Sequence, residues 1–213
     1  MNFDRIAPFY HAMERWFAGR CLQSCRLAFL EQISSPALVL MVGEGHGMFL
    51  VPFRRKFPHA QIVVIDGSAK MLEIAADHLK KAGVGAEGVT FVRAMVEEWI
   101  PPDRKFDLIV TNFVLDCLTA VELEKTVRKL ASVAGPDAQW LVADFQIPER
   151  GLARWRSRII IGLLYRFFGV TAGLEARSLV SPDSSIKGAG FRLLDRKTWD
   201  WELLKSEWWR RNS

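Results

Sequence analysis

One stretch of the chain, residues 38–50, places the strongest constraint on the fold. It reads LVLMVGEGHGMFL: five apolar residues, Leu38–Val42, run directly into a turn that contains Gly43, Gly45 and Gly47. The residues after the turn have the apolar spacing of a helix. A buried strand that ends in glycines and opens a helix is typical of a nucleotide-binding turn. Glycine lets the backbone approach a ligand closely, and the start of the helix offers unpaired N–H groups.

The spacing of these glycines indicates which nucleotides the turn suits. Dinucleotide-binding proteins use G-x-G-x-x-G, which would need a glycine where this chain has Met48. The chain instead has G-x-G-x-G, because its third glycine comes one residue early, at Gly47. Glycine-rich turns also occur for structural reasons alone. The turn by itself therefore leaves a purely structural role open.

A second β-branched run, Gln61–Ile65, ends at Asp66, which lies 66 − 47 = 19 residues beyond Gly47. In doubly wound folds an acid at the end of the second strand accepts hydrogen bonds from ribose hydroxyls. A carboxylate suits this role because it only accepts and can take both hydroxyls. Ser68 has the place of an N-cap for a helix over Ala69–Lys81. The alternative is a solvated acid at a strand end.

Strands alternate with helices along the chain, which predicts an α/β fold with a mostly parallel sheet covered on both faces. Only Trp199–Glu202 separates the last two strands, so they should form a hairpin with one antiparallel edge strand. We expect a seven-stranded Rossmann-like sheet in one domain of residues 1–213. The expected strands are Ala37–Val42, Gln61–Ile65, Val89–Arg93, Phe106–Thr111, Ala138–Phe145, Phe191–Lys197 and Leu203–Arg210, and the main helices are Met48–Lys56, Ala69–Lys81, Ala120–Ala134 and Leu152–Phe168.

The charge of the chain is moderately basic. The 29 Lys and Arg against 24 Asp and Glu give a net charge of +5, and the excess gathers in five arginines between residues 150 and 166. Such a patch can bind nucleic acid or anionic lipid, or it can be a solvated helix face. No recognised nucleic-acid module accompanies it, so we expect no nucleic-acid partner.

Cysteine and apolar patterns indicate the compartment. Three cysteines give no disulfide framework, and Cys21 and Cys25 have no set of histidine or cysteine partners that would hold a metal. The longest candidate run for a membrane, Ile159–Tyr165, is far shorter than the ~20 residues that span a bilayer. The N-terminus lacks a signal-peptide core. We therefore expect a cytoplasmic protein without a metal site.

With these motifs in place, the chain resembles the class I S-adenosylmethionine (SAM) dependent methyltransferases, with a layout like the ubiquinone/menaquinone C-methyltransferases. Four segments carry the resemblance. Residues 3–10, FDRIAPFY, are similar to an N-terminal FDxIAxxYD signature, and VGEGHG is similar to the first motif. Val64–Leu72 is similar to the second motif, and Val142–Pro148 to a fifth-strand E/D-F-x-x-P motif. The resemblance implies SAM as cofactor, S-adenosylhomocysteine as product and a small-molecule acceptor.

The chain departs from the family pattern at two acids. Met41 stands where the family has an acid near the cofactor's methionine end, and Glu44 could take its place. Met95 stands where the family has an acid that meets the adenine amino group, which leaves the backbone of Met95 and Val96. Met71 fits a core position as well as a cofactor contact. The expected cofactor contacts are Gly43, Glu44, Gly45, Gly47, Asp66, Gly67, Ser68, Met71, Met95, Val96 and Asn112.

The acceptor site should lie beyond the carboxyl ends of the strands. Methyl transfer from a sulfonium needs alignment in a dry pocket rather than a metal or a covalent nucleophile. Asp116 and Asp144 are the candidate bases, although Asp116 could simply begin the next helix. We expect Tyr10, Phe113 and Phe145 to contact the acceptor. Residues 1–35 would then form a helical lid.

A helical insertion over residues 150–188 would complete the cover of this site. Its helix, residues 150–168, is basic at first and then strongly apolar. As a lid it favours an apolar acceptor, as an interfacial helix it would contact anionic membrane, and it could also be a core helix.

Two other functions stay open. Met41 and Met95 motivate a non-catalytic SAM-binding regulatory or partner subunit. A nucleic-acid methyltransferase rests only on the basic charge, because residues 111–114 read TNFV rather than an N/D-P-P-Y/F motif. The identity of the acceptor, the methylated atom and the oligomeric state stay open.

Overall fold

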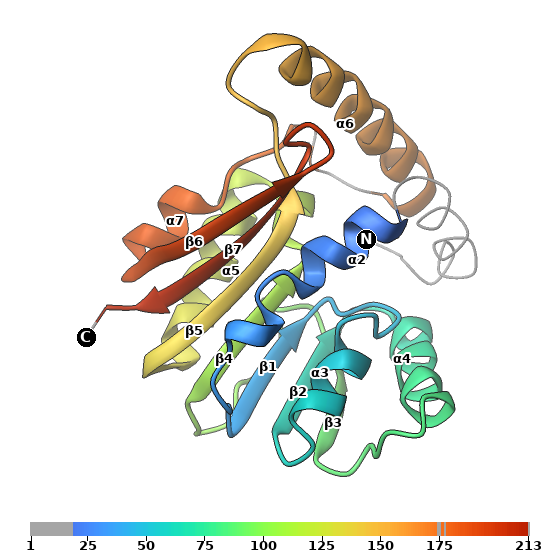
Figure 1. Ribbon diagram of the computed structural model, residues 1–213, viewed down its shortest axis with the longest axis vertical. Coiled ribbons are helices and arrows are strands. Elements are labelled where there is room, and N and C mark those ends of the chain that lie inside the picture. Colours follow the sequence, from blue (N-terminus) through green and yellow to red (C-terminus); the bar gives the residue numbers. More distant parts are fainter. Residues whose placement is uncertain (1–18, 174–175, 177, 213) are drawn as a thin grey trace.

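The computed structural model describes residues 19–173, 176 and 178–212. One seven-stranded sheet runs through this part of the chain, in the order β3-β2-β1-β4-β5-β7-β6 (Figure 1). The strands β1 to β5 are parallel, whereas β7 is antiparallel to both of its neighbours. The expected α/β fold with an antiparallel C-terminal strand is thus confirmed. The strands are β1 (Leu38–Val42), β2 (Gln61–Asp66), β3 (Val89–Arg93), β4 (Phe106–Asn112), β5 (Ala134–Phe145), β6 (Phe191–Trp199) and β7 (Leu204–Arg211).

One detail of the sheet differs from the sequence prediction. The antiparallel strand β7 is not an edge strand, because it lies between β5 and β6. Its side chains need cover on both faces: Trp209 packs in one core, and Trp208 packs against the other. The edge position falls to β6, whose residues are mostly exposed or half-buried.

Two hydrophobic cores cover the two faces of the sheet, because successive residues of a strand point to opposite sides. In β1, Val39 and Met41 pack in one core, while Leu40 and Val42 pack in the other. The first core is closed by α3, α4 and the segment after α2, and the second by α5 and α7. The helices are α2 (Gly19–Leu27), η2 (Leu30–Gln32), α3 (Leu50–Lys56), α4 (Ala69–Lys81), η3 (Leu115–Cys117), α5 (Ala120–Val133), α6 (Gly151–Ala172) and α7 (Asp183–Gly188).

Several boundaries follow the sequence patterns closely, and the differences have local causes. The structure gives α4 the expected bounds, with Ser68 as its N-cap. Strand β5 begins four residues earlier than expected, because Ala134 pairs with Phe106 before a register shift in the ladder. Helix α6 continues to Ala172 and ends at Gly173, whose φ of 68° is left-handed. In Figure 1, α6 lies beyond the carboxyl end of β5 rather than against a face of the sheet.

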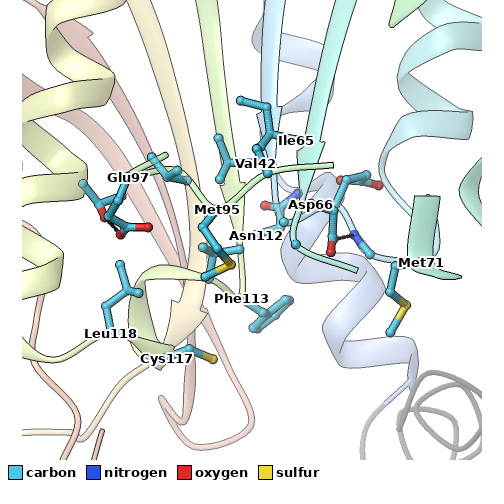
Figure 2. A pocket seen from close by; sticks show the side chains of 18 of the residues that line it. Val42, Ile65, Asp66, Met71, Met95, Glu97, Asn112, Phe113, Cys117 and Leu118 are labelled. Atoms are coloured by element: carbon cyan, nitrogen blue, oxygen red, sulfur yellow. Dashed lines mark hydrogen bonds between the residues drawn. The ribbon is translucent and has the colours of Figure 1, made fainter. Parts of the chain in front are cut away.

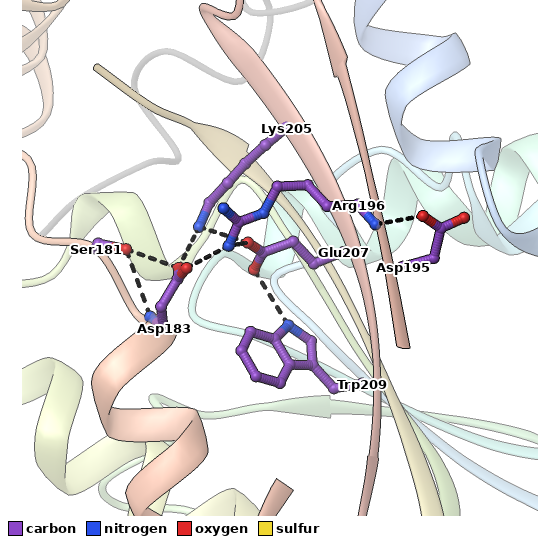
Figure 3. A network of polar contacts seen from close by, with 7 residues as sticks. All are labelled: Ser181, Asp183, Asp195, Arg196, Lys205, Glu207 and Trp209. Atoms are coloured by element: carbon purple, nitrogen blue, oxygen red, sulfur yellow. Dashed lines mark hydrogen bonds and ion pairs between the residues drawn. The ribbon is translucent and has the colours of Figure 1, made fainter. Parts of the chain in front are cut away.

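An ion network, buried at Lys205 and Glu207, joins the C-terminal hairpin to α7 (Figure 3). Lys205 Nζ lies 2.5 Å from Asp183 Oδ1 and 2.9 Å from Glu207 Oε1. Arg196 makes ion pairs with the same two carboxylates, and Trp209 Nε1 donates to Glu207 Oε2 at 3.1 Å. Burial by itself raises the pKa of Asp183, but Lys205 and Arg196 hold that pKa below its ordinary value. The network therefore ties the hairpin to the start of α7.

Candidate functional site

A cavity lies at the carboxyl ends of β1, β2 and β4 (Figure 2). Nine of the eleven expected cofactor residues line it: Gly43, Glu44, Gly45, Asp66, Gly67, Met71, Met95, Val96 and Asn112. Phe113, expected at the acceptor site, lines it too, whereas Gly47, Ser68 and Phe145 are not among its described lining residues. Tyr10 and the rest of residues 1–18 of the expected lid lie outside the described residues.

The three glycines of the turn after β1 have positive φ angles but different surroundings. A Cβ on Gly43 would lie 2.2 Å from Val114 Cγ2, and a Cβ on Gly47 would lie 3.1 Å from the backbone of Ala75 in α4. A Cβ on Gly45 would meet nothing within 4 Å. Gly43 and Gly47 therefore serve close packing within the protein, while Gly45 turns its backbone toward open space at the cavity.

Asp66 ends β2 and connects the two loops that form this side of the cavity. Its Oδ2 accepts the backbone N–H of Gly45 at 3.1 Å, and its Oδ1 accepts that of Ser68 at 2.8 Å. Ser68 Oγ in turn accepts the N–H of Met71 at 3.1 Å, which caps α4. Ser68 thus acts as a helix cap beside the cavity. Asp66 places a carboxylate at the cavity wall, where Figure 2 shows it opposite Met95.

Glu44 lies within the glycine turn, but its carboxylate serves the next helix. Its Oε1 accepts the N–H groups of Phe49 and Leu50 at 2.7 and 2.8 Å, at the start of α3. Burial raises the pKa of Glu44 to about 7, although these N–H donors and the charge of Arg26 oppose the shift. Met41, where the family has an acid, is fully buried in a hydrophobic core. An acid at position 41 would therefore be costly, whereas Glu44 is a lining residue of the cavity whose carboxylate is bonded to the start of α3.

Arg26 is a lining residue that sequence reasoning missed. It comes from α2, is 8% exposed, and its guanidinium lies 5.0 Å from the centroid of the Phe113 ring. The sequence offered no motif for it, because Arg26 lies 17 positions before the glycine turn, 43 − 26 = 17. Its place depends on how α2 packs over the sheet. His46 is a second missed lining residue and is 4% exposed.

Glu97 and Thr126 form a polar group at the other end of the cavity. Thr126 Oγ1, from α5, donates to Glu97 Oε1 at 3.0 Å, and both residues line the cavity. Met95 packs closely on Gly67, because a Cβ on that glycine would lie 2.7 Å from the Met95 sulfur. An acid is thus present on the cavity wall two residues after Met95. The sequence contained a signal for Glu97, because this residue directly follows Val96, where we expected a contact with adenine.

The end of β4 contributes an amide and a strained aromatic residue. Asn112 is 6% exposed, and its Nδ2 has no hydrogen-bond partner among the described residues. Phe113 has φ 58°, which is rare for a residue with a side chain, and its N–H donates to Ala143 O at 2.6 Å. Its ring lies 5.6 Å from that of Phe145. An amide donor without a partner and a strained backbone at one cavity wall indicate a site built for a ligand.

The two candidate bases lie near each other but outside the described lining of the cavity. Asp116 and Asp144 are 5% and 0% exposed. Burial raises the pKa of Asp116 to about 6, and burial together with the charge of Asp116 raises the pKa of Asp144 well above its ordinary value. Neither oxygen of Asp144 has a hydrogen-bond partner in the described part of the chain. Cys117 lines the cavity beside them, and Tyr165 of α6 donates to the backbone oxygen of Asp116 at 2.6 Å.

Residues 39–137 match the protein family described as a methyltransferase domain. This part of the chain is similar to a methyltransferase domain. The matched segment contains the glycine turn, Asp66, Glu97 and Asn112, and therefore most of the cavity wall. The family resemblance that the sequence motifs predicted is confirmed.

Curated relatives resemble the methyltransferase domain over similar lengths. The chain is 30% identical over 112 residues to the uncharacterized methyltransferase YcgJ of Bacillus subtilis, which is 52% of this chain and 42% of YcgJ. It is 31% identical over 111 residues to the ubiquinone/menaquinone biosynthesis C-methyltransferase UbiE of Haemophilus ducreyi, again 52% of this chain and 42% of that protein. The match thus spans less than half the length of either relative.

Solved structures share the fold over almost the whole chain. A putative O-methyltransferase from Nostoc punctiforme superposes with a TM-score of 0.72 at 20% identity, over 96% of this chain and 59% of the other. The 1,6-didemethyltoxoflavin-N1-methyltransferase of Burkholderia thailandensis gives a TM-score of 0.69 at 15% identity, over 98% and 85%. That structure holds 1,6-didemethyltoxoflavin and S-adenosylhomocysteine. At these identities the likeness establishes the fold of the methyltransferase domain and its C-terminal strands.

Proposed function

We propose that this chain is a SAM-dependent methyltransferase that acts on a small, fairly apolar acceptor. The observation that carries the proposal is the Asp66 carboxylate at the cavity wall, bonded to the N–H of Gly45 where the turn opens toward the cavity. This pairs a ribose-binding acid with an exposed backbone turn in a methyltransferase domain. The buried Nδ2 of Asn112, without a described partner, fits the same reading because a polar ligand would satisfy it.

Each end of the cavity offers chemistry that suits one part of SAM. Asp66 would accept hydrogen bonds from the ribose hydroxyls. Glu97 and the backbone of Met95 and Val96 would meet the polar edge of adenine, at the end where Thr126 lies. Arg26 would attract the carboxylate of the methionine portion, because it is a buried cation on the cavity wall.

The acceptor would lie on the side of Phe113 and Phe145, under α6. When bound, SAM would supply a methyl group that its sulfonium already activates, so the chain has to align the acceptor and exclude water. The aromatic rings would hold an apolar acceptor, and residues 150–188 would cover it. Tyr165 supports that cover, because its bond to Asp116 O fixes α6 against the carboxyl ends of the strands.

Asp116 and Asp144 remain our candidates for accepting the acceptor's proton. The pKa of Asp116, which burial raises to about 6, suits proton uptake near neutral pH, since a base works best when its pKa is near the working pH. Burial and the charge of Asp116 raise the pKa of Asp144 as well. Because neither is among the described lining residues, access would run beside Cys117. Asp116→Asn should lower kcat while leaving SAM affinity unchanged, and a change in SAM affinity alone would contradict the proposed role.

Calorimetry and a methyl-release assay together test the proposed function. Purified chain is titrated with SAM and with S-adenosylhomocysteine, and methyl release is then measured over a panel of phenols, quinols and amines. We expect binding of both cofactor forms and release with at least one apolar acceptor. Absence of binding would overturn the cofactor assignment. Binding without release on any acceptor would overturn the enzymatic part and leave a SAM-binding module.

A further inference from the structure

The outer face of α6 carries a continuous stripe of exposed apolar side chains. Leu152, Trp155, Ile159, Leu163 and Val170 are 78%, 68%, 43%, 62% and 85% exposed. Their spacing of three, four or seven residues places them on one side of a helix. At 1.5 Å per residue the stripe is about 27 Å long. Exposed apolar surface of this extent on one element marks an interaction surface.

The opposite face of α6 holds the helix to the rest of the chain. Ser157 and Ile161 are 0% and 4% exposed, and Tyr165 donates to Asp116 O. Arg156, which flanks the outer stripe, pairs with Asp200 at 3.0 Å, in the turn between β6 and β7. The residues that attach α6 to the rest of the chain are therefore not those of the outer stripe. It is a second apolar face that the described residues leave uncovered.

The charge of α6 indicates which kind of partner would bind its outer stripe. The helix contains four arginines and no acidic residue. Asp200 neutralises Arg156, while Arg154, Arg158 and Arg166 are exposed. Two copies of α6 packed stripe to stripe would place two positively charged helices side by side, with no carboxylate on either helix. An anionic surface would instead complement them.

We propose that α6 docks the protein on anionic lipid membranes, with its axis in the plane of the surface. A helix that combines exposed arginines with a separate Trp, Leu and Ile face has the composition of helices that lie at the boundary between headgroups and acyl chains. Trp155 suits that boundary, because indole is apolar over most of its surface and carries one N–H donor. Among the described residues, no helix is both long and apolar enough to cross a bilayer. The inference concerns α6 alone and does not depend on the reaction in the cavity.

Vesicle flotation of the full chain tests this proposal. The vesicles are phosphatidylcholine alone, or a two-to-one mixture of phosphatidylcholine and phosphatidylglycerol. We expect binding to the mixed vesicles that salt weakens. Replacing Arg154, Arg158 and Arg166 together by glutamine should lower the partition coefficient roughly 100-fold. The matched control replaces three exposed cations elsewhere, Lys80, Lys81 and Arg104, by glutamine and should bind like the wild type.

The apolar stripe is tested separately. Leu163→Glu should lower the partition coefficient about tenfold or more. Its control is Ile100→Glu, because Ile100 is 87% exposed in the loop between β3 and β4. Circular dichroism checks that each variant folds. The proposal is overturned if the wild type does not float with anionic vesicles, or if the α6 variants bind as well as their controls. A dimer that Leu163→Glu dissociates, without any vesicle binding, would instead assign the stripe to a second copy of the chain.

Discussion

The Oδ2 atom of Asp66 accepts the backbone N–H of Gly45 at 3.1 Å, across the gap between the ends of β2 and β1. The other oxygen of the same carboxylate accepts the N–H of Ser68. One side chain thus fixes both loops at the cavity wall before any ligand binds. Such preorganisation favours affinity, because the loops need not be ordered when the ligand arrives.

Replacing Asp66 by alanine should weaken SAM binding by about 1–3 kcal/mol, because the ribose hydroxyls would lose their acceptor inside a partly closed site. Calorimetry measures the change. Asp103→Ala is the matched control, since Asp103 is an exposed acid in a loop away from the cavity lining. Wild-type affinity in the Asp66 variant would show that the ribose assignment is wrong.

Three glycine-to-alanine variants separate backbone strain from contact with the ligand. Gly45 and Gly83 have φ values of 62° and 65°, and a Cβ at either position meets nothing within 4 Å. Alanine should therefore cost each of them about 1–2 kcal/mol of folding stability. Of these two, only Gly45→Ala should also reduce SAM affinity, because Gly45 lines the cavity and Gly83 does not.

Gly43→Ala should be the least stable of the set. It adds the clash with Val114 Cγ2 to the same backbone strain, and crowding of this kind costs about 1–3 kcal/mol more. Urea unfolding and calorimetry on the same preparations give both quantities. Equal loss of SAM affinity in the Gly45 and Gly83 variants would contradict the placement of the ligand at the turn.

Local patterns in the sequence were enough to predict most of the fold. The glycine turn, Asp66 and the Ser68 cap all depend on residues within a short segment, and each lies where its pattern placed it. The position of β7 was not predictable in the same way. A hairpin can add to a sheet with either of its strands inside, and the choice depends on cover for Trp208 and Trp209 on opposite faces.

In the candidate site, too, the sequence predicted the residues that depend on local patterns but not those that depend on packing. Residues at strand ends were predictable, because parallel strands bring their carboxyl ends to one edge. Arg26 and Thr126 reach the cavity from helices, so their contribution depends on packing that no local motif encodes. Asp116 and Asp144 were expected at the cavity, yet the fold buries both of them. The sequence pattern placed these acids at the ends of strands, but it does not determine whether their carboxyl groups face the cavity or the protein interior.

Stability should depend on pH through Glu44. Its pKa is about 7 in the folded protein against an ordinary value of 4.5, so the folded state holds the proton more tightly than the unfolded state. The stabilisation is complete below about pH 4.5 and is lost as the pH rises to about 7, by up to about 3 kcal/mol. Glu44→Gln keeps an acceptor for Phe49 and Leu50 but removes the titration.

Urea unfolding at pH 5 and pH 8 measures this dependence. Wild type should lose more stability between the two pH values than Glu44→Gln does. Both proteins should keep a shared decrease from Asp116, whose raised pKa acts in the same direction. The same difference between pH 5 and pH 8 in both proteins would refute the prediction for Glu44.

Lys205→Met should destabilise the fold by about 3 kcal/mol, because it leaves Glu207, which is 0% exposed, without its lysine partner. Arg196 and the Trp209 N–H still contact that carboxylate and limit the loss. Adding Glu207→Leu should restore part of the stability, since an apolar pair no longer buries an uncompensated charge.

Arg210→Met on the same strand is the control: its pair with Asp137 is exposed, so the loss should stay below about 1 kcal/mol. Urea unfolding of the wild type, the two single variants and the double variant measures these differences in stability. If the double variant is less stable than Lys205→Met alone, Glu207 contributes through Arg196 and Trp209 rather than through the lysine, and the network is held mainly from β6 and β7.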